Sequence, residues 1–129
     1  MRKIAPALLL VSVLALLLFA CAKSSNPSAK AVEDYLTAMA DKKSDRLSAL
    51  SCSDWESNAL QELNSLQTVK TRLEGLSCAV TGVDGSTTDV VCQGNIIVTS
   101  NNEDQQLDLS VRTYQVVQQD GKYLVCGYK

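Results

Sequence analysis

The sequence predicts an α+β fold in which N-terminal helices precede an antiparallel meander of four strands. Apolar residues recur with a helical period up to about Leu66 and with a period of two from Leu73 onward. Two turn signals, Asp84-Gly85-Ser86 and Asp120-Gly121, divide the second half into hairpins. Four cysteines follow Cys21, and an even number in a short chain predicts two disulfides if the chain is exported.

Three helices are expected before the sheet. Asn26-Pro27 opens the first, with the asparagine as its cap and the proline in its first turn. A break at residues 41–44 separates it from a short second helix. Ser53 and Glu56 form a capping box that opens a third helix, which should end between Ser65 and Thr71. The apolar positions are Val32, Tyr35, Leu36 and Met39 in the first, Leu47 and Leu50 in the second, and Trp55, Ala59, Leu63 and Leu66 in the third.

Four strands are expected after the helices. Alternating apolar positions mark the first three: Leu76, Cys78 and Val80; Val90, Cys92, Gly94, Ile96 and Val98; Leu107, Leu109 and Val111. Tyr114 and Val116 fall out of phase with the third group, so a bulge near Arg112-Thr113 is needed to keep one face buried. Residues 123–128 form the last strand after the Asp120-Gly121 turn.

Hairpin register predicts the disulfide pairing. If residues 84–86 form a three-residue turn, Cys78 and Cys92 lie directly opposite each other, about 4.5–5.5 Å apart at Cα. Cys52 and Cys126 then form the second pair, joining the helices to the last strand. A four-thiolate metal site is the alternative, but it usually requires closely spaced cysteine pairs that this chain lacks.

The N-terminus has the features of a secretory signal peptide. A basic start is followed by an apolar run from Ile4 to Leu18 and a small residue, Ala20, before Cys21. A transmembrane helix and an ordinary signal peptide with a bystander cysteine are the alternatives; the run is short for a span and contains Pro6. The segment 18–21 resembles the lipobox of bacterial lipoproteins.

That resemblance implies cleavage before Cys21 and a lipid, such as a palmitate-bearing diacylglycerol, on its thiol. The expected organisation is a signal peptide (1–20), a lipidated tether (21–28) and a folded domain (29–129). The protein would then be secreted and held at the cell surface, on the extracytoplasmic face of the cell membrane, with the membrane as its partner through Cys21.

Composition restricts the classes of function. Without residues 1–20 the chain has 109 residues, enough for one domain, and ten basic against fourteen acidic residues. No basic stripe is present, so nucleic-acid binding is not expected. The chain has no histidine, which removes the commonest general base and metal ligand; neither a metal nor a cofactor is expected.

The mature chain resembles the nuclear-transport-factor-2-like superfamily, whose members have a cystatin-like α+β cone. The resemblance covers residues 29–129 and is carried by three segments: 31–39, 43–47 and 120–128. It implies three helices on a strongly curved antiparallel sheet that encloses a pocket. Enzymes of this superfamily mostly use Asp/His or Tyr/Asp constellations in that pocket, and without histidine none is carried over to this chain.

The candidate pocket residues are the aromatics Tyr35, Trp55, Tyr114 and Tyr123, for which core packing is the alternative. Asp41 and Asp45 are candidate catalytic carboxylates, for which a role at the helix break is the alternative. Three functions remain open: a lipid-anchored binding or accessory domain, a small-molecule-binding cone, and an isomerase- or hydratase-like enzyme. The first, without catalysis, is the leading expectation, and its protein or small-molecule partner is not specified by the sequence.

Overall fold

The computed structural model describes residues 26–129. The expected signal peptide, the lipidation site Cys21 and most of the tether lie outside the described residues. The helices are α1 (Pro27–Ala40), α2 (Ser44–Ala49) and α3 (Ser53–Ser65). They are followed by β1 (Lys70–Asp84), β2 (Thr87–Ser100), β3 (Glu103–Asp108), the short 3₁₀ helix η1 (Leu109–Val111), β4 (Thr113–Gln119) and β5 (Lys122–Tyr128). Among these helices, none has the length and apolar character that a membrane span requires.

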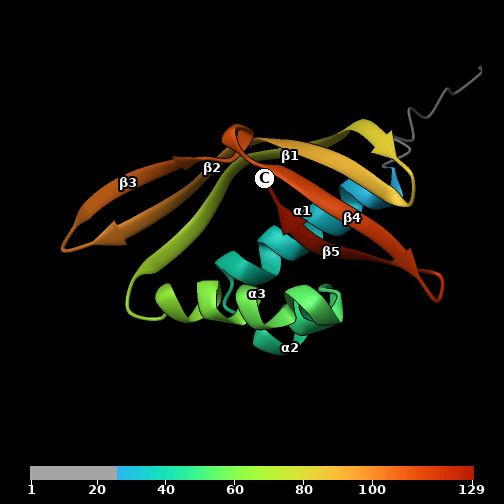
Figure 1. Cartoon of the computed structure of the whole chain (residues 1–129). Coiled ribbons are helices and arrows are strands. Elements are labelled where there is room, and N and C mark those ends of the chain that lie inside the picture. Colours follow the sequence, from blue (N-terminus) through green and yellow to red (C-terminus); the bar gives the residue numbers. More distant parts are fainter. Residues whose placement is uncertain (1–25) are drawn as a thin grey trace, which may run out of the picture.

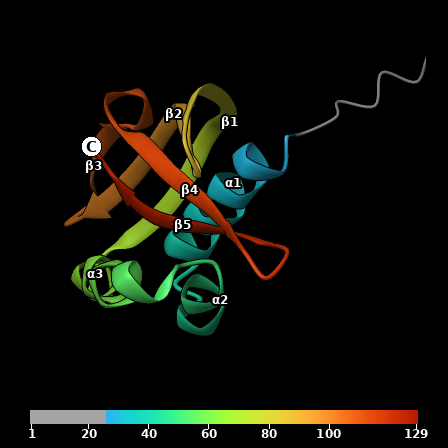
Figure 2. The ribbon, with the colours of Figure 1, turned by 45° about the vertical axis from the view of Figure 1, so that its right-hand side comes forward.

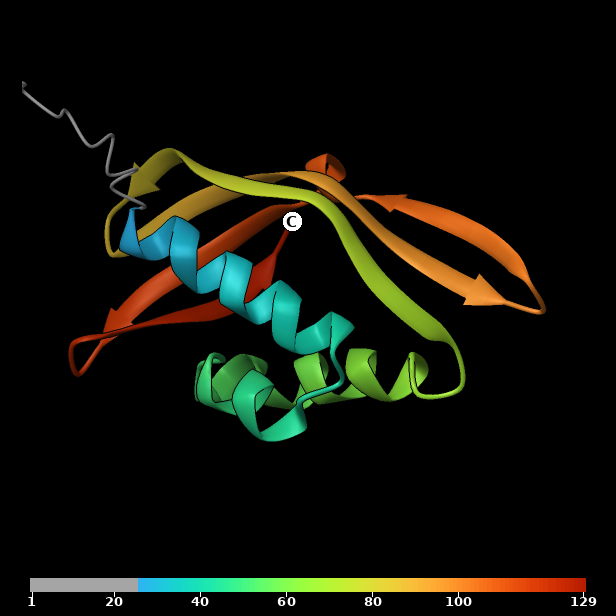
Figure 3. The same cartoon turned by 180° about the vertical axis from the view of Figure 1, so that it is seen from behind.

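The α+β prediction is confirmed: three helices pack on one curved antiparallel sheet (Figure 1). The sheet order is β1-β2-β4-β5, and β3 pairs with the other half of β2. Figure 3 shows how strongly β1 bends as it crosses the domain. Figure 2 shows α1 alongside the sheet, with α2 and α3 grouped near the C-terminal end of α1. This is the arrangement that the resemblance to the nuclear-transport-factor-2-like superfamily implies.

The helix boundaries follow local capping chemistry. The side chain of Asn26 accepts a hydrogen bond from the Ser28 amide at 2.8 Å, so α1 begins at Pro27, two residues before the expected domain boundary. The expected capping box at Ser53 is wrong, because Ser53 is the first residue of α3 and the N-cap before it makes no side-chain capping hydrogen bond. Cys52 is the N-cap of α3, and its carbonyl accepts hydrogen bonds from the amides of Trp55 and Glu56.

The sheet has five strands where four were expected, because η1 divides the third one. The turn lies at Leu109–Val111, just before the bulge expected near Arg112-Thr113. It returns the chain to the phase that buries Tyr114 and Val116. Of the three apolar residues expected to share a buried face, only Leu109 is buried, whereas Leu107 and Val111 are 48% and 75% exposed. The end of the sheet that carries β3 is therefore incompletely covered.

Both predicted cysteine pairs lie at disulfide distance, Cys78 with Cys92 and Cys52 with Cys126. This pairing excludes the four-thiolate metal site. The expected three-residue turn is wrong, however: Gly85-Ser86 is a two-residue turn, and a bulge between Val80 and Gly82 shifts the register back by one. The two differences cancel, so Cys78 still faces Cys92.

The second disulfide lies where the chain between α2 and α3 meets β5. Ser51 forms a parallel bridge with Val125, and the Cys52 amide donates to the Val125 carbonyl at 3.0 Å. The Cα atoms of Cys52 and Cys126 are consequently 5.2 Å apart. The bridge therefore joins the helical layer to the last strand.

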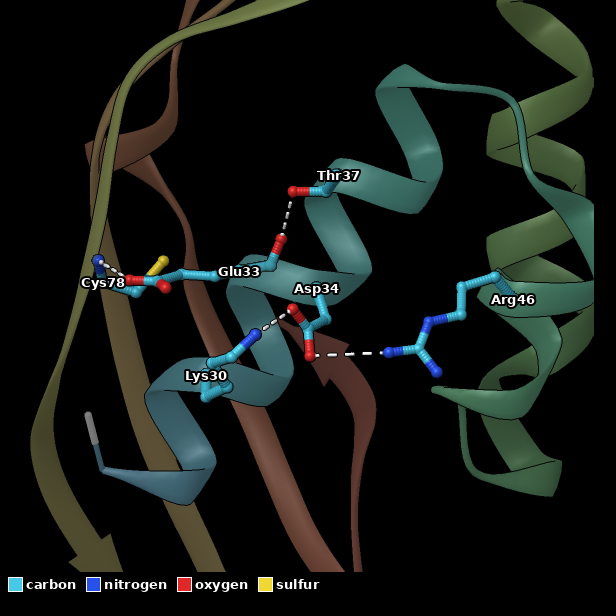
Figure 4. Close-up of polar contacts among 6 residues, drawn as sticks. All are labelled: Lys30, Glu33, Asp34, Thr37, Arg46 and Cys78. Carbon is cyan, nitrogen blue, oxygen red and sulfur yellow. Dashed lines mark hydrogen bonds and ion pairs between the residues drawn. The ribbon is translucent and has the colours of Figure 1, made fainter. Parts of the chain in front are cut away.

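Helix α1 is attached to both layers by its polar side (Figure 4). The carboxylate of Glu33 accepts a hydrogen bond from the Cys78 amide of β1 at 3.0 Å. Asp34 pairs with Lys30 in the same helix and with Arg46 of α2, the latter at 3.6 Å. The opposite side of α1 enters the core, where its predicted apolar stripe is almost fully buried.

Candidate functional site

A pocket of about 750 Å³ lies between α3 and the end of the sheet that carries β3 and η1. We refer to it as the α3–β3 pocket; Figure 1 shows this projecting end of the sheet at the left, above α3. Its aliphatic lining consists of Met39, Leu66, Ile96, Leu107, Leu109 and Val111. Its uncharged polar lining consists of Asn58, Gln61, Ser65 and Gln106. Two aromatic residues, Trp55 and Tyr128, and three charged ones, Glu62, Asp108 and Arg112, complete it.

An aromatic cluster lies at and behind the pocket wall. The rings of Trp55 and Tyr128 meet edge to face, with centroids 5.4 Å apart. The ring centroids of Tyr128 and Tyr114 are 5.6 Å apart, and those of Tyr114 and Tyr35 are 6.1 Å apart. The indole N–H of Trp55 donates to the Tyr35 hydroxyl at 3.0 Å. The cluster thus connects α1, α3, β4 and β5 and fixes the orientation of the pocket-lining indole.

An ion pair joins the two sides of the pocket. The Arg112 guanidinium, directly after η1, donates to the Glu62 carboxylate of α3 at 2.7 Å. The same guanidinium lies over the Tyr128 ring, 4.1 Å from its centroid. Both charged side chains are partly exposed, 33% for Arg112 and 27% for Glu62. Both charged groups are therefore accessible to a ligand and are not enclosed in the core.

The pKa shifts around the pocket hold each group in its ordinary protonation state. Burial raises the pKa of both Tyr35 and Tyr114. Burial opposes the charge on Arg112, but the hydrogen bond and negative charge of Glu62 raise its pKa overall. Hydrogen bonds from the Ser110 side chain and amide lower the pKa of Asp108. Each of these shifts moves the pKa of the group further from neutral pH.

The four aromatic candidates from the sequence occupy three different places. Trp55 lines the α3–β3 pocket. Tyr35 and Tyr114 are each 1% exposed and lie behind its wall in contact with the lining aromatics. Tyr123 is not part of the pocket lining; it lies in β5 opposite Gln118 and packs against the core.

The candidate carboxylates Asp41 and Asp45 lie outside the α3–β3 pocket. Asp41 is the C-cap of α1, and its amide donates to the Thr37 carbonyl. Asp45 occupies the first turn of α2, where a negative charge interacts favourably with the helix dipole. Their positions are those of the helix-break role weighed for them from the sequence.

Of the fifteen residues that line the pocket, only Trp55 was a pocket candidate from the sequence; the missed residues that define its chemistry are Glu62, Arg112 and Tyr128. Glu62 follows Trp55 by seven positions, so it lies near the same face of α3, a spacing that could have been noticed. Tyr128 reaches the pocket side because of a register shift in the β4–β5 pairing between Gln115 and Val116. The one hint of this shift in the sequence was the glycine at position 127, which has a φ of +138° in the structure.

The two buried tyrosines provide a matched pair of substitutions. Tyr35→Phe should lower the free energy of unfolding by about 1–2 kcal/mol, because the Trp55 indole loses its acceptor. Tyr114→Phe should have a smaller effect, because the buried Tyr114 hydroxyl makes no hydrogen bond of normal length and angle among residues 26–129 and lies only near the Arg112 guanidinium, which partly offsets the effect of burial on its pKa. Urea unfolding measures both changes. An equal loss in the two variants would contradict this description of the cluster.

The fold is similar to that of two solved structures. Aln2 from a Streptomyces species aligns with a TM-score of 0.56 and 11% identity, over 79% of this chain and 85% of Aln2. A SEC-C motif containing protein from Rhodopseudomonas palustris aligns with a TM-score of 0.51 and 12% identity, over 77% of this chain and 74% of that protein. At such identities the likeness shows the fold alone. No family model and no curated protein sequence matches the chain.

Proposed function

We propose that this chain is a lipid-anchored, extracytoplasmic domain that binds a small molecule in the α3–β3 pocket without catalysing a reaction. The observation that carries the proposal is the pocket itself, about 750 Å³ in volume. This lies within the range of roughly 300–1,000 Å³ typical of ligand sites. Its mainly apolar walls carry a few convergent polar groups, which is the pattern of a site that buries a ligand and fixes its orientation.

The electrostatics of the pocket support binding without catalysis. Efficient proton transfer needs a group whose pKa lies near the working pH. The pKa of Asp108 is lowered and those of Tyr35 and Tyr114 are raised, so these groups move away from that range. The Glu62 carboxylate is engaged by Arg112. Disulfide pairing also occupies the four cysteine sulfurs of the described residues.

The extracytoplasmic location is supported by the two disulfides, which are typical of oxidising compartments. The direction of α1 fits an anchor at Cys21. Helix α1 starts at Pro27, and the pocket includes its penultimate residue, Met39, about 18 Å further along the helix axis. The six residues of the tether that precede α1, 21–26, reach at most about 20 Å, so α1 would begin near the lipid. The pocket would then face the aqueous phase.

The anchor is tested on the protein extracted from its own membrane. The mature N-terminus should be a lipid-modified Cys21, and Cys21→Ser should release the protein from the membrane fraction. Intact mass measurement and fractionation provide the two results. An unmodified Cys21, a retained Met1, or unchanged membrane association of Cys21→Ser would rule out the anchor and leave the pocket proposal standing.

The pocket is tested with the neutral fluorescent dye phenylnaphthylamine, whose emission rises in apolar surroundings. We expect the dye to bind the mature protein and to alter the emission of Trp55, the single tryptophan of the chain. The double variant Leu107→Ser/Val111→Ser should weaken binding about tenfold, because both side chains line the pocket.

Val83→Ser is the matched control for that variant. Val83 is 70% exposed, close to the 75% of Val111, but it lies near the β1–β2 turn and not in the pocket. The affinity of the Val83→Ser variant for the dye should stay within about twofold of that of the wild type. Absence of dye binding to the wild type, or equal affinity of the double variant, would contradict the proposed site.

A further inference from the structure

The charged groups of the α3–β3 pocket differ in how far they are available to a ligand. Of the three, Asp108 is held by its own chain through one carboxylate oxygen, Oδ1, which accepts from the Ser110 amide at 2.9 Å and from the Ser110 hydroxyl at 2.7 Å. It caps η1 and so has a structural role. The pair formed by Glu62 and Arg112 is instead the charged contact that joins the two sides of the pocket.

The two members of this pair are held with unequal strength. Arg112 is positioned by the backbone between η1 and β4, and its guanidinium rests on the Tyr128 ring. Glu62 lies on one turn of α3, and Arg112 is the partner that the structure gives its carboxylate within residues 26–129. Rotation of Glu62 towards solvent costs one ion pair. Rotation of Arg112 would also remove the cation–π contact.

This asymmetry decides which ligand charge the pocket accepts. An anion can replace Glu62, because the guanidinium stays in place and its fork of N–H donors matches an acid group. A cation that paired with Glu62 would take it away from Arg112 and leave a half-buried guanidinium without a counter-charge, which is costly. The neighbouring apolar lining, including Leu107 and Val111, is suited to the rest of the ligand.

We propose that the pocket binds an amphipathic organic anion, whose acid group pairs with Arg112 in the place that Glu62 occupies in the free protein. The ligand class is an apolar or aromatic body that ends in a carboxylate or a similar acid group. Glu62 is then an internal competitor that sets the affinity. This inference rests on the proposed function, because it requires the α3–β3 pocket to be the binding site.

The test compares two dyes that differ by one sulfonate group, neutral phenylnaphthylamine and anionic anilinonaphthalene sulfonate. Glu62→Gln should strengthen binding of the anionic dye about tenfold and change binding of the neutral dye by less than about twofold. Arg112→Gln should weaken binding of the anionic dye by a similar factor. In the double variant the gain from Glu62→Gln should disappear, because the guanidinium is absent.

Glu56→Gln is the matched control, since it makes the same change of charge in the first turn of α3, outside the pocket lining. It should leave both dye affinities unchanged. Circular dichroism confirms that each variant is folded, since the anionic dye also binds partly unfolded chains. Unchanged or weaker anionic-dye binding by Glu62→Gln, or an equal gain for both dyes, would overturn the inference. Failure of the neutral dye to bind the wild type would overturn the proposed function itself.

Discussion

Replacing Cys52 and Cys126 together by alanine is expected to lower the free energy of unfolding by about 4 kcal/mol. The bridge closes a loop with a sequence separation of 74, and it joins the chain between α2 and α3 to β5. Without it the unfolded chain gains more conformational freedom, and the helical layer loses its covalent link to the sheet. Urea unfolding of the oxidised variant measures the loss.

The Cys78–Cys92 pair is the internal control, because its sequence separation is only 14 and both cysteines lie in one hairpin. Its removal should cost about 3 kcal/mol, so the two double variants should differ by roughly 1 kcal/mol. The opposite order would show that local packing around the hairpin bridge, and not loop length, determines the contribution of each disulfide.

Substitution of Gly94 is expected to have an effect of similar size. Gly94 has a φ of +104°, and a Cβ atom there would lie 2.5 Å from the Glu74 carbonyl oxygen and 2.6 Å from that of Gly75. Both neighbours are backbone atoms at the irregular stretch of β1, where the sheet bends. Gly94→Ala should therefore cost about 3 kcal/mol or more, from backbone strain and from displacement of β1. The midpoint of urea unfolding measures this change.

Gly82→Ala is the matched control for this substitution. Gly82 also lies beside an irregularity of the β1–β2 pairing, but a Cβ atom there would meet nothing within 4 Å, and its φ is not positive. The free energy of unfolding of the Gly82→Ala variant should stay within about 0.5 kcal/mol of that of the wild type. If the two alanine variants were equally stable, the close approach of β1 to Gly94 would not be needed for the bend.

The sequence was sufficient for the fold class because the fold class depends on periodicity. The disulfide pairing was predicted correctly only because the wrong turn length and the bulge between Val80 and Gly82 cancel each other. The buried phase of Val90 and Cys92 in β2 is confirmed, and so is the helical stripe of α1 that includes Val32 and Tyr35. Register was harder to predict, because a bulge shifts the phase without changing composition. The turn at Gly85-Ser86 was misassigned for this reason.

The pocket could not be predicted from periodicity, because it depends on which part of the sheet is left uncovered. Leu107 and Val111 belong to an apolar pattern typical of a buried strand, but η1 and the projection of β3 leave them exposed. The ion pair of Glu62 and Arg112 joins residues 50 positions apart and has no local sequence signal. Trp55 was identified as one of the chain's aromatic residues, and it lines the pocket from α3 beside Gly127 of β5.

The proposed role of the α3–β3 pocket as the ligand-binding site of this domain can be tested residue by residue. The most direct measurement is a two-dimensional ¹H–¹⁵N spectrum of the mature protein titrated with neutral phenylnaphthylamine. If the dye binds in this pocket, the single indole N–H of Trp55 and the amides of Asn58 and Arg112 should shift, with little change at Val83 and Gly121 near the opposite turns. Shifts confined to those turns, or no shifts at dye concentrations that saturate apolar sites, would contradict it.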